Sequence, residues 1–388
     1  MTMKRAYMDH NATAPVRADA ADAVARALAL TGNASSVHGE GRAARALIEQ
    51  ARADVAALVH ARSTEVVFTS GGTEAANLAL HLARSALGAE RLIVSAIEHD
   101  CVRAAAAAQD LPLAVAPVDA DGVINLDALS RLLAAPGRAI VALMLANNET
   151  GVVQPLAEAV ALAREAGALV LTDAIQAAGR MPLDFAALDV DMMLLSAHKL
   201  GGPQGVGALI LRDTLPFEPL IRGGGQEMRR RAGTENLPGI AGFGVAARQA
   251  RDLSGVPRLA ALRDRLEAAI REAAPDVTVF GARAPRLVNT SLFAAPGLDA
   301  ETLIMALDLD GIAVSAGSAC SSGKVARSHV LAAMGVKDVL ARGAIRVSLG
   351  SGNTEEDVDR LAASWSRFVK RAAARNEISA PARERVVS

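Results

Sequence analysis

The chain has 388 residues, of which 51% are apolar, enough to bury a large core divided between two or three domains. Lys and Arg number 41 against 42 Asp and Glu, so no net field favours nucleic acid or an anionic membrane, and small-molecule chemistry is expected instead. The first residues leave no room for a signal-peptide apolar region, and no apolar stretch approaches the roughly 20 residues that cross a bilayer. The two cysteines, Cys101 and Cys320, form neither a disulfide framework nor a metal-ligand cluster. We therefore expect a cytoplasmic protein with no metal site that binds neither nucleic acid nor membrane.

Residues 64–211 alternate short apolar runs with longer amphipathic ones. The short runs are continuously apolar, which is typical of buried, mainly parallel strands. They cover residues 66–69, 92–95, 139–145, 168–172, 192–195 and 206–211. Helical patterns lie between them at 73–86, 101–109 and 156–166. This pattern predicts an α/β domain with helices on both faces of the sheet and ligands at the carboxyl ends of the strands.

The pattern changes after residue 211. Three glycines at 223–225 and three arginines at 229–231 predict an exposed functional loop, and a helix is predicted over 235–253. Beyond Pro257, the chain predicts a smaller α+β domain. Its elements are a first helix, short strands near Val277 and Leu287, a helix near Glu301 and a closing helix over 354–375. We assign no role to the tail after Asn376.

Two of the predicted strand ends carry residues suited to an anionic carbonyl cofactor. Residues 193–202 read Met-Leu-Leu-Ser-Ala-His-Lys-Leu-Gly-Gly, which places Lys199 where it could form a Schiff base. A solvated lysine at a strand exit is an equally good interpretation. Gly72 and Thr73 join a strand to a helix, where free amides and the helix dipole favour a phosphate. An ordinary tight turn with a Thr cap also fits that segment.

Two further strand ends carry an acid and an imidazole. Asp173 ends a buried strand, with Gln176 three residues later, and a carboxylate there could keep a pyridine nitrogen protonated. The alternative is that Asp173 caps a helix. His99 follows another strand and could stack on a planar ring or move protons, although a lone His is more often structural. Four such ends meeting at one crevice are what pyridoxal 5'-phosphate (PLP) needs.

These segments resemble the cysteine desulfurases, the NifS/IscS-like group in the class V branch of the PLP transferases. The resemblance covers almost the whole chain and includes Met-Asp-His-Asn-Ala-Thr-Ala-Pro from Met8, Gly-Asn-Ala-Ser-Ser-Val-His from Gly32 and Ala-Asn-Asn-Glu-Thr-Gly from Ala146. It implies a fold-type I PLP enzyme with a mainly parallel seven-stranded sheet flanked by helices and a smaller α+β domain. The large PLP-binding domain would span residues 15–255, and the small domain residues 1–14 and 256–388.

The resemblance also implies how the cofactor would be held. Lys199 would carry PLP as a Schiff base, Asp173 would pair with the pyridinium nitrogen, Gln176 would bond the phenolic oxygen, and His99 would stack on the ring and move protons. The residues implied as phosphate contacts are Gly72, Thr73, Ser196 and His198, joined by Thr234 from the second subunit of a homodimer.

The same resemblance implies a substrate site for an amino acid. Asn148 would contact cofactor or substrate, and Arg346 would clamp the substrate carboxylate with help from Asn33. A forked guanidinium suits a carboxylate better than an ammonium group does.

Cys320 is the candidate nucleophile. It lies in Ser-Ala-Gly-Ser-Ala-Cys-Ser-Ser-Gly-Lys, residues 315–324, whose small side chains predict a mobile loop. A free cysteine is usually buried and inert, and we assign Cys101, which begins an Ala-rich helix, that structural role. The resemblance implies that Cys320 takes sulfur from L-cysteine as a persulfide, leaves L-alanine and passes the sulfur to an acceptor such as an iron–sulfur scaffold protein.

Other functions share parts of this pattern. A selenocysteine lyase or another class V aminotransferase would use the same cofactor residues. A sulfur-relay or scaffold-binding protein would have lost catalysis, which the presence of Lys199, Asp173 and Arg346 argues against. Ser196 and Lys199 also fit the Ser-x-x-Lys of a serine acyl enzyme, whose Ser-Asp-Asn and Lys-Thr-Gly partners are missing.

Overall fold

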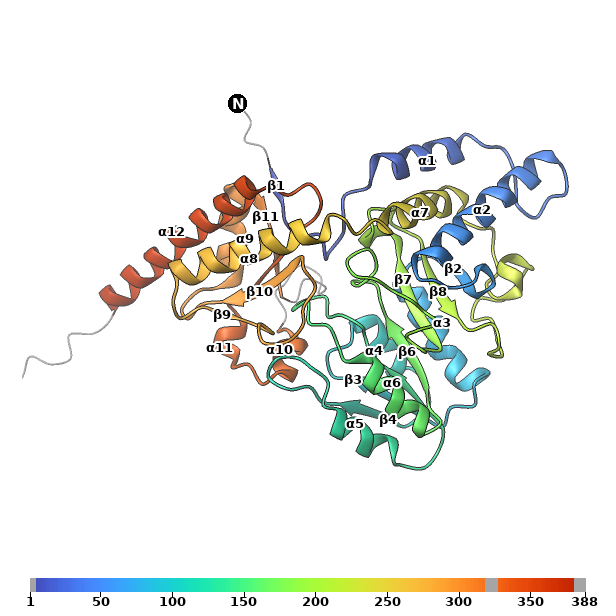
Figure 1. Cartoon of the computed structure of the whole chain (residues 1–388), viewed down its shortest axis with the longest axis horizontal. Helices are drawn as coiled ribbons and strands as arrows, with labels where there is room; N and C mark the ends of the chain where they lie inside the picture. Colours follow the sequence, from blue (N-terminus) through green and yellow to red (C-terminus); the bar gives the residue numbers. More distant parts are fainter. Residues whose placement is uncertain (1–4, 318–326, 380–388) are drawn as a thin grey trace, which may run out of the picture.

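The structure is a computed structural model that describes residues 5–317 and 327–379, with side chains as far as residue 371. It has two lobes, each built around its own sheet (Figure 1). The sheet of the larger lobe has the strand order β2-β8-β7-β6-β5-β3-β4. Its strands are β2 (Val66–Thr69), β3 (Arg91–Ser95), β4 (Leu113–Ala116), β5 (Ala139–Ala142), β6 (Leu169–Asp173), β7 (Met192–Ser196) and β8 (Gly207–Leu211). Only β8 runs antiparallel to its neighbours, which confirms the predicted mainly parallel seven-stranded sheet.

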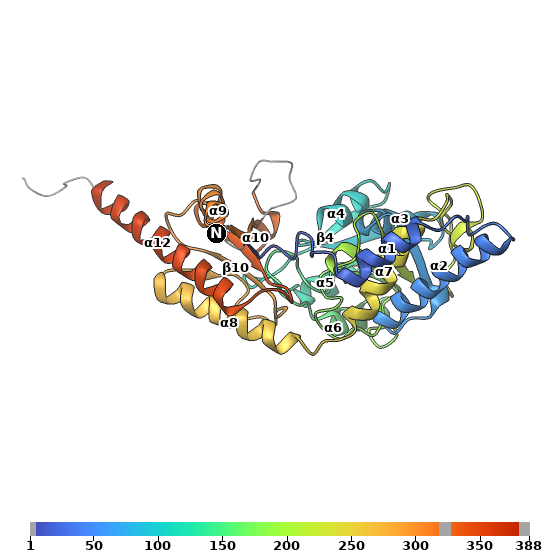
Figure 2. The same cartoon turned by 90° about the horizontal axis from the view of Figure 1, so that it is seen from above.

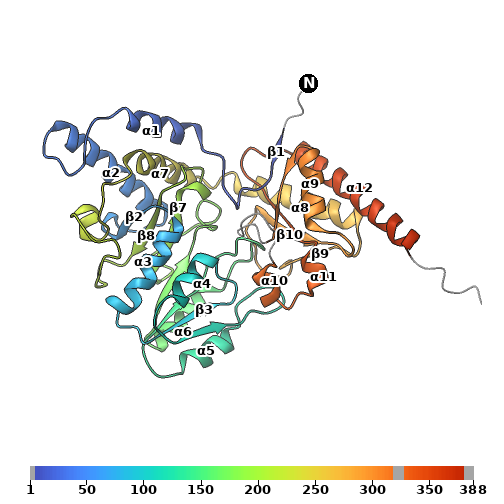
Figure 3. The same cartoon turned by 180° about the vertical axis from the view of Figure 1, so that it is seen from behind.

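Helices cover both faces of this sheet. Those of the larger lobe are α1 (Ala18–Leu28), α2 (Gly39–Leu58), α3 (Gly72–Ser85), α4 (Asp100–Ala107), α5 (Leu126–Leu133), α6 (Leu156–Glu165) and α7 (Leu237–Ala250). One apolar cluster joins α3 and α4 to one face of the sheet, in front of the strands in Figure 3, and a second joins α2, α5, α6 and α7 to the other. Neighbouring residues of β7 divide accordingly, with Leu194 in the first cluster and Met193 and Leu195 in the second. The strands are continuously apolar because both faces are buried.

The smaller lobe holds a four-stranded antiparallel sheet in the order β12-β13-β10-β9. Its elements are α8 (Val256–Ala273), β9 (Thr278–Val279), β10 (Thr290–Ala294), α9 (Ala300–Leu309), β11 (Ile312–Ala313), β12 (Ser315–Ala316), α10 (His329–Ala333), α11 (Asp338–Ala341), β13 (Ile345–Ser348) and α12 (Glu355–Ser379). Near the N-terminus, β1 (Ala6–Tyr7) pairs in parallel with β11, so the start of the chain joins this lobe (Figure 2). The domain boundaries at residues 14 and 255 stay a prediction.

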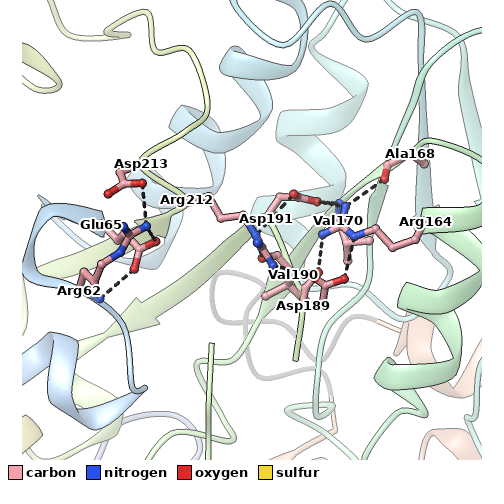
Figure 4. Close-up of polar contacts among 10 residues, drawn as sticks. All are labelled: Arg62, Glu65, Arg164, Ala168, Val170, Asp189, Val190, Asp191, Arg212 and Asp213. Atoms are coloured by element: carbon pink, nitrogen blue, oxygen red, sulfur yellow. Dashed lines mark hydrogen bonds and ion pairs between the residues drawn. The ribbon is translucent and has the colours of Figure 1, made fainter. Parts of the chain in front are cut away.

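A polar network fixes the amino ends of β6 and β7, opposite the ends that carry Asp173 and Lys199 (Figure 4). The buried carboxylate of Asp191 accepts hydrogen bonds from the backbone N–H of Val170 at 2.7 Å and from Nη1 of Arg164 at 2.8 Å. Arg212, which follows β8, donates from Nε to the carbonyl of Val190 at 2.8 Å. These bonds align the three neighbouring strands β6, β7 and β8 at one end. They therefore help to place the site residues at the opposite end of the strands.

The structure also contains elements that the sequence pattern did not predict. In the larger lobe these are α1, α2, α5 and β4, and in the smaller lobe β1, β11, β12, α10 and α11. The edge strand β4 leaves Leu113 40% and Val115 55% exposed, so it lacks the burial on both faces that marks the other strands. The strand predicted over 139–145 ends at Ala142, and the one predicted near Leu287 begins at Thr290. Across residues 5–317 and 327–379, no helix has the length and apolar character needed to span a membrane.

Candidate functional site

A cavity of about 350 Å³ collects most of the predicted site residues at the carboxyl ends of the strands. The predicted residues that line it are Gly72, Thr73, His99, Asn148, Asp173, Gln176, Ser196, His198, Lys199 and Arg346. A larger cavity of about 590 Å³ lies between the lobes and shares Lys199. We take the smaller one as the candidate active site because Asp173, His99 and Arg346 line it and do not line the larger one.

Lys199 is held by the N-terminal segment of the chain. It ends a short 3-10 turn that follows β7, and its Nζ donates to the carbonyl oxygens of Asn11 at 2.6 Å and Ala12 at 2.7 Å. The turn is completed by Gly201, which has a φ of +81° and where an added Cβ would lie 2.8 Å from Cγ of Arg17. A side chain at Gly201 would therefore force either Arg17 or the turn that carries Lys199 to shift.

Asp173 places a buried carboxylate in the cavity. It is 7% exposed, and Oδ1 accepts a hydrogen bond from the N–H of Ile175 at 2.8 Å. Burial raises the pKa of Asp173, while the Ile175 N–H and the charges of His99 and Lys199 act to lower it. The bond to Ile175 closes a turn, and no helix is assigned there, so the alternative interpretation of Asp173 as a helix cap is wrong. A buried carboxylate of this kind suits a protonated heterocyclic nitrogen.

The first turn of α3 and the end of β7 form a cradle for an anion. Gly72 begins the 14-residue helix α3, and an added Cβ there would lie 2.5 Å from Cδ1 of Ile175, so a larger residue would require the end of the Ile175 side chain to move. Ser196 and His198 face the same cavity. Burial, and then the charge of Lys199, lower the pKa of His198 to about 4, which leaves it neutral at pH 7. Free N–H groups at the start of a helix, with hydroxyl and imidazole groups beside them, bind phosphate well.

His99 lies at the start of α4, and its ring caps the helix. The backbone N–H of Cys101 donates to Nδ1 of His99 at 3.1 Å, which makes Nδ1 an acceptor and leaves the ring proton on Nε2. Sγ of Cys101 lies 3.0 Å from the same Nδ1, and Cys101 itself lines the cavity. The sequence predicted only a structural role for Cys101, so its place in the cavity is a finding of the tertiary structure.

Arg346 closes the cavity from the smaller lobe. It lies on β13, is 2% exposed, and donates from Nη2 to Oδ1 of Asp9 at 2.8 Å and from Nη1 to the carbonyl of Asn148 at 3.1 Å. Its Nε is buried without a hydrogen-bond partner in the described part of the chain. A buried donor in this state favours an anionic ligand, because leaving it unpaired is costly.

Two predicted residues, Asn33 and Thr234, do not line this cavity. Asn33 is exposed in the loop before α2, where its Oδ1 accepts from the N–H of Ser35 at 2.8 Å. Thr234 is exposed and lines a separate cavity of about 120 Å³ that also includes Ser70. Cys320 lies outside the described residues. The predicted functional loop at 223–231 is exposed at its three glycines, at Met228 and at Arg229, whereas Glu227 is 5% exposed and anchored by Arg52.

Asn11 is the main residue of this site that the sequence analysis did not single out. Its carbonyl accepts from Lys199 and, at 3.1 Å, from Nε2 of Gln176, while its side-chain Nδ2 donates to Oγ1 of Thr290 at 2.9 Å. It therefore links the cofactor-binding candidates to β10 of the smaller lobe. The only signal in the sequence was its position in the N-terminal segment of the family resemblance.

The residues in the cavity fit PLP. The buried Asp173 suits its pyridine nitrogen, the start of α3 at Gly72 suits its phosphate, and Lys199 is an amine that can bond to its aldehyde. These three groups lie around one cavity, so a single bound PLP could meet the carboxylate with its ring nitrogen, the start of α3 with its phosphate and the amine with its aldehyde. No group of three or more His, Cys, Asp or Glu side chains suitable for a metal ion occurs among the residues that the structure describes.

Comparisons with known proteins agree with this geometry. A model of the family described as "Aminotransferase class-V" matches residues 6–361. The cysteine desulfurase of Cereibacter sphaeroides is 45% identical over 370 residues, which are 92% of this chain and 94% of the relative. The solved structure of a NifS-like protein from Rickettsia africae ESF-5 has a TM-score of 0.87 and 33% identity, and the match covers 94% of this chain and 99% of that one. A structure described as "SspA in complex with cysteine" has a TM-score of 0.77 and 29% identity, and the match covers 89% of this chain and 98% of that one.

Proposed function

The chain belongs to the class V aminotransferase family, and from this premise we propose that it is a PLP-dependent cysteine desulfurase. It would convert L-cysteine to L-alanine and place the sulfur on Cys320 as a persulfide. The observation that carries the proposal is the cavity that brings Lys199, Asp173 and Arg346 together. The relatives named as cysteine desulfurases, and the related structure that contains cysteine, support L-cysteine as the substrate.

The residues of the cavity divide the work of binding. Asp173 and Gln176 would hold the two polar atoms of the PLP ring, and Lys199 would hold its aldehyde carbon. Gly72, Thr73, Ser196 and His198 would hold its phosphate. When bound, PLP supplies an electron sink that stabilises negative charge on the substrate Cα.

Arg346 would bind and orient the substrate carboxylate. Its Nε is left without a partner among the described residues, and Asp9 and Asn148 hold the two Nη atoms, so the guanidinium is fixed at the cavity wall before substrate enters. Asn148 would contact cofactor or substrate from the same wall of the cavity.

Lys199 and His99 would move the protons. The Nζ atom of Lys199 would accept the proton from the substrate Cα, because its contacts to the carbonyls of Asn11 and Ala12 place a flexible amine at the cavity wall. His99 would stack on the PLP ring and carry its exchangeable proton on Nε2.

The Cys320 thiolate would attack the substrate sulfur. The new S–S bond forms as the substrate C–S bond breaks, its electron pair stays with the carbon, and protonation of that carbon gives alanine. We propose that an acceptor such as an iron–sulfur scaffold protein then takes the sulfur. We also propose that the protein acts in the cytoplasm as a homodimer in which Thr234 of each subunit completes the phosphate site of the other. Thr234 is exposed and does not line the candidate active-site cavity of its own subunit, which supports this arrangement.

The proposal is tested by L-alanine release from L-cysteine in the presence of a reductant. Lys199→Ala should abolish it, and Cys320→Ala should lower it severely. Without reductant, mass mapping after exposure to cysteine should find one added sulfur atom on Cys320 and none on Cys101. Sulfide release that continues unchanged in Cys320→Ala would refute the persulfide role. Efficient release of selenium, but not sulfur, would favour a selenocysteine lyase instead.

The dimer has its own test. Neither Lys199→Ala nor Thr234→Ala alone should form normal active sites, whereas a mixed dimer of the two variants should regain one site in two. A monomer in light scattering, or no recovery on mixing, would contradict the shared phosphate site.

A further inference from the structure

Arg180 is a buried cation next to the candidate site, and none of the roles above uses it. It is 9% exposed, and its Nη1 donates to the backbone carbonyl of Gln176 at 2.7 Å and to its side-chain Oε1 at 2.6 Å. In the described ranges, no Asp or Glu oxygen lies within 4.0 Å of its guanidinium nitrogens. Burial, and then the charge of Arg346, lower the pKa of Arg180 to about 10, so it is still charged at neutral pH. A buried charge without a counter-ion is costly, which indicates a function.

The backbone after β6 places Arg180 against Gln176. Residues 174–181 form consecutive turns, in which the N–H of Ala178 donates to the carbonyl of Ala174 at 2.9 Å and the N–H of Arg180 donates to that of Ala177 at 2.9 Å. Side chains four residues apart therefore lie on the same side. The turn is tight at Gly179, which has a φ of +72° and where an added Cβ would lie 3.0 Å from Cβ of Ala250.

This contact, together with the hydrogen bond to the Asn11 carbonyl, decides which way the Gln176 amide points. A guanidinium can only donate hydrogen bonds, so Oε1 must face Arg180, and Nε2 then faces the carbonyl of Asn11 at 3.1 Å and the cavity. Without Arg180, only the Asn11 carbonyl would hold the amide, which could then rotate and present its oxygen to the cavity. Because the phenolic oxygen of bound PLP is an acceptor, only the observed orientation would bind it.

We propose that Arg180 is a positioning residue that fixes the Gln176 amide with Nε2 directed at the phenolic oxygen of PLP, an inference that rests on the proposed function for the cofactor alone. The other charged or titratable groups around this pair are His10, Lys199, Asp173 and Arg346. His10 carries no charge at neutral pH, because burial and then the charge of Arg180 lower its pKa to about 4. Arg180 therefore supplies a permanent positive charge to the ring-oxygen side of the site.

The test uses the visible absorbance of the PLP-loaded protein as a function of pH. Arg180→Met should raise the pH midpoint of the absorbance change by on the order of one pH unit, because without Nε2 of Gln176 directed at it the phenolic oxygen keeps more negative charge, which favours the protonated form of the Lys199 nitrogen. PLP dissociation should increase by roughly tenfold, the usual effect of losing one hydrogen bond. Arg180→Lys, which keeps the charge and one donor, should restore most of the midpoint. If Arg180→Met does not fold, Arg180→Lys still tests the inference through the same midpoint.

Two comparisons separate positioning from a structural role or a direct field effect. In a Gln176→Ala background, Arg180→Met should add less than half of its original shift. Arg91→Met is the matched control, since Arg91 also donates to backbone carbonyls, at Leu132, Leu133, Ala135 and Gly137, but lies at the start of β3. It should lower stability without moving the midpoint.

An unchanged midpoint in both Arg180 variants would overturn the inference, and so would the full shift in the Gln176→Ala background. The midpoint does not depend on turnover. A protein that shows the shift but forms no alanine from L-cysteine would support the inference and refute the proposed function. A protein that forms alanine from L-cysteine but shows no shift would support the proposed function and refute the inference.

Discussion

Replacing Glu149 by Gln should make the folded protein more stable above neutral pH while leaving its stability in acid almost unchanged. Glu149 is 4% exposed, and its Oε2 accepts a hydrogen bond from Oγ of Ser328 at 2.6 Å. Burial raises the pKa of Glu149 from 4.5 to about 7, with the Ser328 bond and the charge of Arg346 acting against this rise. The rise corresponds to about 3 kcal/mol of folding free energy.

The sign follows from the two protonation equilibria. Below pH 4.5, Glu149 is protonated in both states and costs nothing. Between pH 4.5 and about 7, the unfolded chain loses the proton while the folded protein keeps it, so rising pH favours unfolding. Above about pH 7, both states are ionised and the difference is constant. Gln cannot ionise, so the stability gain of Glu149→Gln should grow through this window and then level off at about 3 kcal/mol.

The assay is denaturant unfolding at a series of pH values, followed by the fluorescence of Trp365. Trp365 is the one tryptophan in the sequence and is buried in the smaller lobe, where its ring centroid lies 5.1 Å from that of Phe293. Ser328→Ala is a useful second variant, since it removes the hydrogen bond but leaves the carboxyl group. A stability difference between Glu149→Gln and the parent that stays the same from pH 5 to pH 8 would refute the reasoning.

Three other substitutions test separate parts of the structure. Arg346→Lys should raise the KM for L-cysteine by roughly 10- to 100-fold with a smaller effect on kcat, because an ammonium group cannot replace the forked guanidinium; an unchanged KM would remove Arg346 from substrate binding. Glu227→Gln should cost about 3–5 kcal/mol in equilibrium unfolding, because Glu227 and Arg52 form a buried bidentate pair at 2.7 and 2.8 Å; a loss below about 1 kcal/mol would contradict this anchor. Asp191→Asn should cost about 2 kcal/mol and leave KM unchanged, because it lies at the opposite ends of the strands from the site; a large KM effect would show that strand alignment reaches the cavity.

The candidate site was predictable to the extent that it depends on strand ends. Thr73, His99, Asp173 and Lys199 each follow an apolar run, and the carboxyl ends of parallel strands meet at one edge of a sheet. Their convergence on one cavity could therefore be predicted without knowing how the helices pack. Arg346 required the family resemblance, because a short strand in a second lobe carries no pattern that points to the first.

The sequence alone determined the sheet type, the order of its main elements and the strand ends that carry cofactor chemistry, because these depend on periodicity within a few residues. Only the tertiary structure decided which groups touch. The carbonyl of Asn11 lies against Lys199, 188 positions away, and Nε2 of Gln176 lies 165 positions from the same carbonyl. Cys101 and His99 are only two positions apart, but the sequence of the helix near Cys101 does not show that Cys101 lines the cavity. Such contacts form when the N-terminal segment crosses from one lobe to the other, and no local pattern of hydrophobic residues encodes that path.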